Sequence, residues 1–347
     1  KSIDIDTSQR ENVLAALRAI AASPHPIFAR ALALSATPHD AEVHRELILA
    51  IGALKAPQFL PVLASALARR GTREAARRGL TALGKEAIEY LRILSFDKDT
   101  PRGVSLHVPR TLARFFDPSA VEALLALIER HKDGLVRFKA LRGLGRIVTR
   151  APRTPVSAKR LEAAIGVAIA DTERAHQAFR ALRAHVLADV ARGAAPGDGA
   201  SAVGPLVLEY LAARRKQALE RIFRLLAIRF PTEDYYRIGM SISAALGSTQ
   251  VRTNLYREAR ELLETILRSR QRRPLLTLLI SLENDTPAVL RPLQAIAEEV
   301  ASFGEMGAAL AAELADSLPQ ATPLAEPPAN REFGVVRRCV SGTSEAT

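Results

Sequence analysis

The chain has little of several residue types on which common functions depend. It contains a single cysteine, Cys339, no tryptophan, and only 5% aromatic residues among its 347 positions. One cysteine excludes a disulfide framework and a cysteine-based metal site, and it is typical of a reducing compartment. Because aromatic and β-branched residues dominate strands, a composition rich in Ala, Leu, Arg and Glu favours helix over sheet.

Long hydrophobic runs are also missing. The most apolar windows, residues 163–170 and 275–280, are far shorter than the ~20 residues that a helix needs to cross a bilayer. No signal peptide is visible. We therefore predict no membrane span in this chain. The chain begins at Lys1 rather than at a methionine, which leads us to expect a processed or excised part of a longer protein.

Patterns that carry catalysis are absent or incomplete. Gly79 to Lys85 matches the front of a phosphate-binding loop, but Glu86 stands where a Ser or Thr hydroxyl would bind magnesium. The seven histidines are scattered, without the i, i+4 pair or carboxylate cluster of a metal site. We therefore predict no catalytic residue, no cofactor and no metal, and we do not expect an enzyme.

Residues 133–150 give the clearest structural signal in the sequence. At 100° per residue, six apolar residues fall within an arc of roughly 140°: Val136, Ala140, Leu141, Leu144, Ile147 and Val148. The opposite side collects a basic stripe, Lys139, Arg142, Arg146 and Arg150. Arg137 is the exception, since it falls inside the apolar arc four residues after Asp133. We predict that Arg137 is largely buried and pairs with Asp133 or a neighbouring carbonyl.

Similar helix endings recur along the chain and indicate repeats. The segments that end at Gly52, Gly84 and Gly145 share one pattern of small and apolar residues, at intervals of 32 and 61 residues. Small residues let paired helices approach closely, and the glycine is expected to close each helix. Asp40, Asp117 and Thr232 are N-cap candidates at helix starts.

These signals predict an all-α fold, an α-solenoid of antiparallel helix pairs without a sheet. The predicted solenoid covers residues 1–318, with a possible internal break at 151–156 and a mobile loop at 193–204. Residues 319–347 are Pro-rich and then polar, and we interpret them as a tail or linker.

Several segments resemble a known repeat family. Residues 108–113, 120–125 and 135–141 resemble consecutive HEAT repeats. Residues 218–226, followed by Phe230-Pro-Thr-Glu-Asp234, are similar to the HEAT domain attached to some bacterial ATP/ADP-translocase-like membrane transporters. The resemblance covers roughly residues 40 to 270. It implies a cytoplasmic appendage, tethered to the inner membrane through a transporter portion that is not in this chain.

In HEAT proteins the second helix of each hairpin lines a concave face, and an arginine often pairs with an aspartate near the turn. The resemblance thus implies that the basic stripe faces a groove and that Asp133 and Arg137 are structural. HEAT-like DNA glycosylases for alkylated purines share the fold, but their site uses tryptophans, which this chain lacks. HEAT-like bilin lyases also share it, and nothing here indicates a bilin site.

Basic residues are the strongest functional signal. The net charge is +12, and residues 130–160 contain ten Lys or Arg against one acid, Asp133. The candidate partner-binding residues are Lys139, Arg142, Arg146, Arg150, Arg214, Arg221 and Arg224. The basic stripe is either a solvated helix face or a surface for a polyanion, because arginine contacts to phosphate are independent of sequence. We predict a non-catalytic scaffold that binds a protein partner or the transporter portion. The alternative is a nucleic-acid-binding protein with a basic groove.

Overall fold

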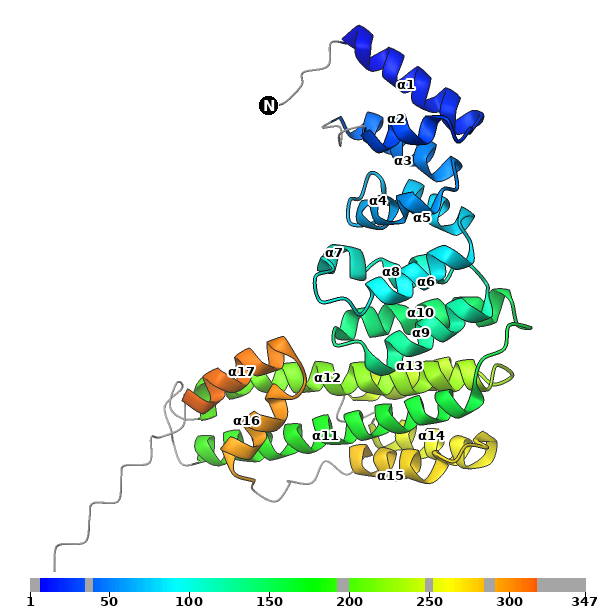
Figure 1. The fold of residues 1–347 in the computed structure, drawn as a ribbon. Helices are drawn as coiled ribbons and strands as arrows, with labels where there is room; N and C mark the ends of the chain where they lie inside the picture. Colours follow the sequence, from blue (N-terminus) through cyan, green and yellow to red (C-terminus); the bar gives the residue numbers. More distant parts are fainter. Residues whose placement is uncertain (1–6, 35–39, 192–199, 247–251, 284–290, 317–347) are drawn as a thin grey trace, which may run out of the picture.

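The computed structural model describes residues 7–34, 40–191, 200–246, 252–283 and 291–316, and within them every regular element is a helix (Figure 1). These residues contain no strand. The all-α class predicted from composition is therefore confirmed for this part of the chain. The predicted tail at 319–347 lies outside the described residues.

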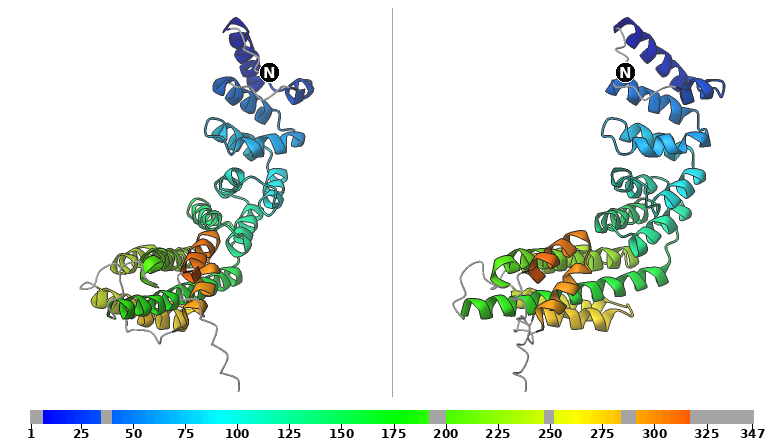
Figure 2. Two further views of the ribbon diagram at one scale, coloured as in Figure 1. Left: turned by 90° about the vertical axis from the view of Figure 1, so that its left-hand side faces the viewer. Right: turned by 60° about the vertical axis from the view of Figure 1, so that its left-hand side comes forward.

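The first ten helices succeed one another along an elongated body, which we call the N-terminal stack (residues 7–150; Figures 1 and 2). Its elements are α1 (Thr7–Ala22), α2 (Phe28–Leu34), α3 (Ala41–Ala53), η1 (Pro57–Phe59), α4 (Leu60–Ala66), α5 (Arg73–Ala82), α6 (Lys85–Leu94), α7 (Arg102–Ser105), α8 (Val108–Leu112), α9 (Pro118–Arg130) and α10 (Gly134–Arg150).

Side-chain caps fix several helix starts. The Asp40 carboxylate accepts hydrogen bonds from the backbone N–H groups of Glu42 and Val43, both at 2.9 Å. Asp117 accepts from Ser119 N at 2.7 Å. Such caps satisfy N–H groups that have no partner inside the helix. The cap prediction at Thr232 is wrong, because α13 begins at Tyr235 and is capped by Asp234.

Glycines let neighbouring helices of the stack approach closely, as predicted. A Cβ at Gly52 in α3 would lie 2.7 Å from the Cα of Gly79 in α5. Gly84 closes α5 with φ of +64°, a conformation that glycine adopts without strain. Gly52 and Gly145 instead lie inside α3 and α10. The prediction that every repeat glycine ends a helix is therefore wrong at these two positions.

The remaining helices form the C-terminal block (residues 158–316), built on two long helices that run side by side (Figures 1 and 2). Its elements are α11 (Ala158–Ala191), α12 (Ala200–Arg229), α13 (Tyr235–Ala245), α14 (Arg252–Ile266), α15 (Arg272–Glu283), α16 (Leu293–Ala301) and α17 (Glu305–Asp316). The predicted break at 151–156 falls between α10 and α11. Of the predicted loop, residues 200–204 are helical and begin α12, and the rest lies outside the described residues.

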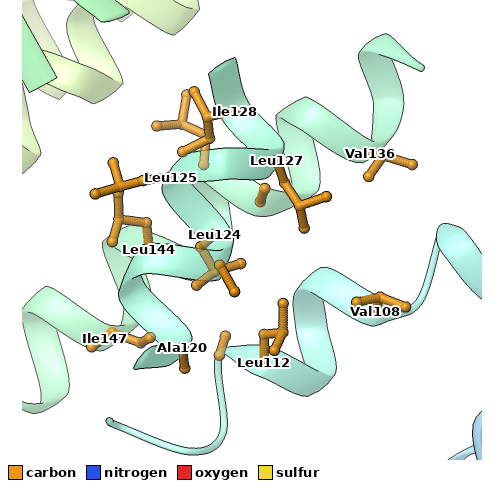
Figure 3. Packing of buried hydrophobic residues seen from close by; sticks show 14 of the residues in the cluster. Val108, Leu112, Ala120, Leu124, Leu125, Leu127, Ile128, Val136, Leu144 and Ile147 are labelled. Atoms are coloured by element: carbon orange, nitrogen blue, oxygen red, sulfur yellow. The ribbon is translucent and has the colours of Figure 1, made fainter. Parts of the chain in front are cut away.

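Two hydrophobic clusters hold these regions. The first runs through the whole stack and continues into α11 to α15; Figure 3 shows Leu112, Leu124 and Leu144 meeting between α8, α9 and α10. The second lies farther along α11 and α12 and is closed by α16 and α17. It includes Leu182, Leu211, Ile296 and Val300. No helix of the described residues is long and apolar enough to cross a membrane.

Candidate functional site

The structure divides the predicted basic stripe on α10. Arg142, Arg146 and Arg150 are exposed, and none of them forms a hydrogen bond or an ion pair with the described residues. Lys139 is half-buried, and its Nζ donates to the carbonyl of Leu106 at 3.1 Å. Lys139 thus ties α10 to the segment before α8, while the other three remain available to a partner.

The three exposed arginines belong to a larger basic surface. Burial lowers the pKa of Arg146, and the guanidinium groups of Arg110, Arg150, Arg114 and Arg142 lower it further. Arg110 lies in α8 and Arg114 just after it. Four cations, two from α10 and two from α8 and the residues just after it, therefore act on Arg146 and raise the local positive potential.

The basic surface continues to α5. Burial lowers the pKa of Arg77 to about 10, and the nearby Arg110 and Arg114 contribute to the same shift. Arg73, on the same helix, is a further cationic neighbour of Arg77. We call this group the arginine ridge, defined as Arg73, Arg77, Arg110, Arg114, Arg142, Arg146 and Arg150. Arg77 itself is buried beneath the surface, and Arg73 donates to the carbonyls of Leu67 and Ala68, both at 2.8 Å.

One carboxylate, Glu74, lies among the ridge residues. Its two oxygens accept hydrogen bonds from Arg114 at 2.8 and 2.9 Å, and Arg77 lies 3.6 Å from one of them. The hydrogen bonds from Arg114 hold the pKa of Glu74 below its usual range. A single negative charge against seven positive ones leaves most of the ridge charge uncompensated.

The ridge surrounds a histidine that carries no charge near neutral pH. Burial lowers the pKa of His107 to about 4, and Arg73, Lys139, Arg77 and Arg110 contribute. Its Nδ1 lies 3.5 Å from Nη2 of Arg77, which fits a neutral ring that accepts from the guanidinium.

The second predicted group, Arg214, Arg221 and Arg224, does not extend the ridge as one surface. Arg224 forms two hydrogen bonds with Glu220, at 2.8 and 2.6 Å, and lies over Phe138 and Tyr236. Arg142 also lies over Phe138, 5.9 Å from its ring centroid. Phe138 thus contacts Arg142 of the basic stripe and Arg224 of the second predicted group. Arg214 and Arg221 lie near Arg137 instead.

The predicted pair of Arg137 with Asp133 is wrong. Oδ1 of Asp133 accepts from Leu135 N at 2.8 Å, and Oδ2 accepts from Nε of Arg102 at 2.9 Å. Arg137 is half-buried, and its Nε has no hydrogen-bond partner within the described part of the chain. Both carboxylate oxygens of Asp133 are occupied by other donors, and the side chain of Arg137 lies beside Arg214 of α12.

A cavity of about 650 Å³ lies between α10 and α12, near the place where Arg142 and Arg224 lie over Phe138. Both predicted arginines, Arg142 and Arg224, line it, together with the carboxylates Glu233 and Asp234. The other lining residues are Leu141, Gly145, Val148, Thr149, Pro152, Ala227, Ile228, Pro231, Thr232 and Tyr236. The described residues contain no group of three or more His, Cys, Asp or Glu side chains that could hold a metal ion.

The members of the ridge that sequence reasoning missed are Arg73, Arg77, Arg110 and Arg114. They lie on α5, on α8 or just after α8. Only the packing of these helices against α10 brings them near the stripe, and no local sequence pattern specifies that packing. Neither the protein-family models nor the curated proteins searched contain a match to this chain.

Proposed function

We propose that this protein is a non-catalytic helical-repeat scaffold, a HEAT-like α-solenoid that binds a polyanionic partner along the arginine ridge. The observation that carries the proposal is the charge on the ridge. Seven arginines from α5, α8, α10 and the segment after α8 lie near one another with one carboxylate among them. Such a surface repels itself and gains free energy when a negative partner neutralises it.

The solenoid part of the proposal is supported by the order of the helices. Consecutive helices of the stack lie next to each other, and one hydrophobic cluster runs through them (Figures 1 and 3). The small-residue contact between Gly52 and Gly79 recurs in kind at Gly143, where a Cβ would lie 3.1 Å from the carbonyl of Pro109. Repeated close contacts between neighbours are typical of repeat proteins.

Two chemical classes of partner fit the ridge. The first is an acidic protein surface, which is what a scaffold would bind. The second is nucleic acid, favoured by the exposed Arg142, Arg146 and Arg150 following one another along a single face of α10. Arginine suits phosphate because its planar group donates two parallel hydrogen bonds.

A titration of labelled duplex DNA at two salt concentrations tests the second class. Each neutralised phosphate of duplex DNA contributes about −0.9 to the slope of log affinity against log salt, so four contacts give about −3.6. We expect the variant Arg142→Glu/Arg146→Glu to bind at least about tenfold more weakly, since two attractive contacts become repulsive. The matched control is Arg272→Glu/Arg273→Glu, which changes net charge equally at exposed positions on α15.

The outcomes separate the two classes. Loss of affinity in the ridge variant but not in the control supports nucleic acid as the partner. Failure of the wild type to bind DNA at low salt removes that class; polyglutamate then replaces DNA in the same titration as a probe for acidic protein. Equal binding of polyglutamate by the wild type and the ridge variant would remove the ridge as a binding surface.

The resemblance of residues 40 to 270 to the translocase-attached domain supports one more proposal. We propose that the chain works in the cytoplasm as an appendage of an ATP/ADP-translocase-like transporter, whose membrane portion is its partner. A continuous reading frame that encodes a series of hydrophobic spans next to this segment would support this. A stop codon directly before it and another directly after it would contradict it.

A further inference from the structure

A second group of arginines converges at the N-terminal end of α10, away from the ridge. Gly134 is the first residue of α10, and a Cβ at this position would lie 3.6 Å from Nη1 of Arg214 and 4.0 Å from Nη2 of Arg137. Two guanidinium groups from α10 and α12 thus approach a single point. Arg221, about two helical turns farther along α12 than Arg214, is an electrostatic neighbour of both.

The two carboxylates near Arg137 and Arg214 are bound by other arginines. Asp171 of α11 accepts from Nη2 of Arg174 at 2.5 Å and from Nη1 of Arg221 at 3.1 Å. Asp133, the other nearby carboxylate, caps α10 and binds Arg102. Neither existing carboxylate therefore forms an ion pair with Arg137 or Arg214.

The guanidinium groups of Arg137 and Arg214 have N–H donors that form no hydrogen bond within the described residues. Among the described residues, no hydrogen-bond acceptor meets the guanidinium group of Arg137 or Arg214, and Nε of Arg137 is shielded from solvent. Burial lowers the pKa of Arg137, and Arg214 lowers it further. Asp171 and Asp133 oppose this shift without cancelling it. Because partly buried like charges without acceptors are costly, an anion bound between them would lower the free energy of the folded state.

An aromatic ring and a glycine shape the space around these arginines. Phe303, which is buried at the turn between α16 and α17, lies under Arg214 at 5.6 Å and under Arg174 at 5.9 Å. Gly134 has no side chain, which leaves space beside the first turn of α10. The elements that meet here are α10, α11, α12 and the α16–α17 turn.

We propose that Arg137, Arg214 and Arg221 form a binding site for a phosphate-type oxyanion between α10 and α12. The guanidinium groups of Arg137 and Arg214 would each donate to the anion's oxygens, in the forked geometry that suits phosphoryl groups. Arg221, held by Asp171, supplies further positive charge. The occupant is either free phosphate or the terminal phosphate of a phosphomonoester. This site is separate from the arginine ridge and does not rest on its role.

Isothermal titration calorimetry of the full chain with inorganic phosphate, at constant ionic strength set with sodium chloride, tests the site. We expect saturable binding by the wild type and a thermal midpoint that rises with phosphate concentration. Arg214→Met should weaken phosphate binding by about tenfold or more, because it removes charge-assisted hydrogen bonds. The control Arg272→Met removes an exposed arginine from α15 and should retain wild-type affinity.

Arg137→Met adds a readout that a folding defect cannot imitate. Without phosphate, this variant should melt no lower than the wild type, because the change removes a half-buried charge that has no partner. With phosphate, it should lose the rise in thermal midpoint. Phenyl phosphate, compared with inorganic phosphate, distinguishes the sources: tighter binding assigns the site to a phosphomonoester, and weaker binding assigns it to the free ion.

Two results would overturn the proposal. One is the absence of saturable phosphate binding by the wild-type chain at millimolar concentrations. The other is equal phosphate affinity in the wild type, Arg214→Met and Arg137→Met, which would place the anion elsewhere on the protein.

Discussion

The exposed arginines on α8 and α10 of the N-terminal stack differ from several arginines of the C-terminal block, which are paired with carboxylates. In the block, Arg221, Arg224, Arg260 and Arg291 lie 3.1, 2.6, 3.5 and 2.7 Å from a carboxylate oxygen. Exposed arginines of the stack on α8 and α10 have other arginines as neighbours instead. An ion pair largely cancels its own field, whereas unpaired cations add theirs. The cations on α8 and α10 therefore reinforce one another's field on that side of the stack.

The two regions also differ in how their helices are held. In the stack, helices of at most 17 residues meet at small side chains and share one cluster. In the block, α11 and α12 contain 34 and 30 residues and contribute to both clusters. Damage to the first cluster should therefore affect both regions, whereas damage to the second should stay at the far end of the block.

The largest effect is expected from Leu124→Ala. The Leu124 side chain is fully buried in the first cluster, so its truncation should lower the free energy of unfolding by about 2–5 kcal/mol. Urea unfolding followed by circular dichroism measures this loss. Ile296→Ala, at an equally buried position of the second cluster, should raise amide hydrogen exchange in α16 and α17 and leave α3 to α10 unchanged.

Hydrogen exchange resolved by peptide decides between one cooperative unit and two. If Ile296→Ala also accelerated exchange in α3 to α5, the two clusters would unfold together and the distinction between them would be wrong.

A smaller effect is expected where α3 meets α5. In Gly52→Ala, the new methyl group would lie 2.7 Å from the Cα of Gly79, which is backbone and cannot rotate away. We expect a loss of about 1–3 kcal/mol from overpacking. Gly71→Ala is the matched control, because nothing lies within 4 Å of its Cβ position. Thermal unfolding of both variants checks this, and wild-type stability in Gly52→Ala would contradict the close approach.

The smallest effect concerns pH. Burial and the surrounding cations lower the pKa of His107 to about 4 in the folded chain, whereas an unfolded histidine has a pKa of about 6.5. The unfolded state therefore binds the proton first as pH falls. The stability linked to His107 is fully present above pH 6.5 and is lost progressively towards pH 4.

His107→Gln removes this titration. After allowance for solvent screening, the wild type should lose of order 1–2 kcal/mol more than the variant over this range. The pKa of His44 is lowered too, by burial and Arg69, but His44 is present in both proteins and cancels. Parallel stability curves for the two proteins, measured in urea at several pH values, would show that His107 is not shielded in the folded state.

Local signals predicted the helices well because their causes are local. Asp40 and Asp117 cap the helices that follow them, through hydrogen bonds to N–H groups two or three residues away. The apolar arc of residues 133–150 likewise requires only the helical period, and Val136, Leu144 and Ile147 are buried as expected.

The pairings failed because their causes are distant in sequence. Asp133 was assigned to Arg137 by spacing and by the resemblance to HEAT repeats, but Arg102 of α7, 31 residues earlier, donates to it instead. Arg137 lies beside Arg214 of α12, a neighbour that no local pattern specifies. The ridge residues on α5 and α8 were missed for the same reason, since their proximity to α10 depends on how these helices pack together.

Helix α11 has a mechanical consequence. Its 34 residues span about 50 Å at 1.5 Å per residue. The part near Leu161 is clamped in the first cluster, and the part near Leu182 carries α16 and α17 in the second. Together with α12 it connects the two clusters. A tilt of about 5° where these long helices meet the stack would move their far ends by about 4 Å. A small change in the angle between α11 and the stack would thus displace α16 and α17 by nearly the length of a side chain.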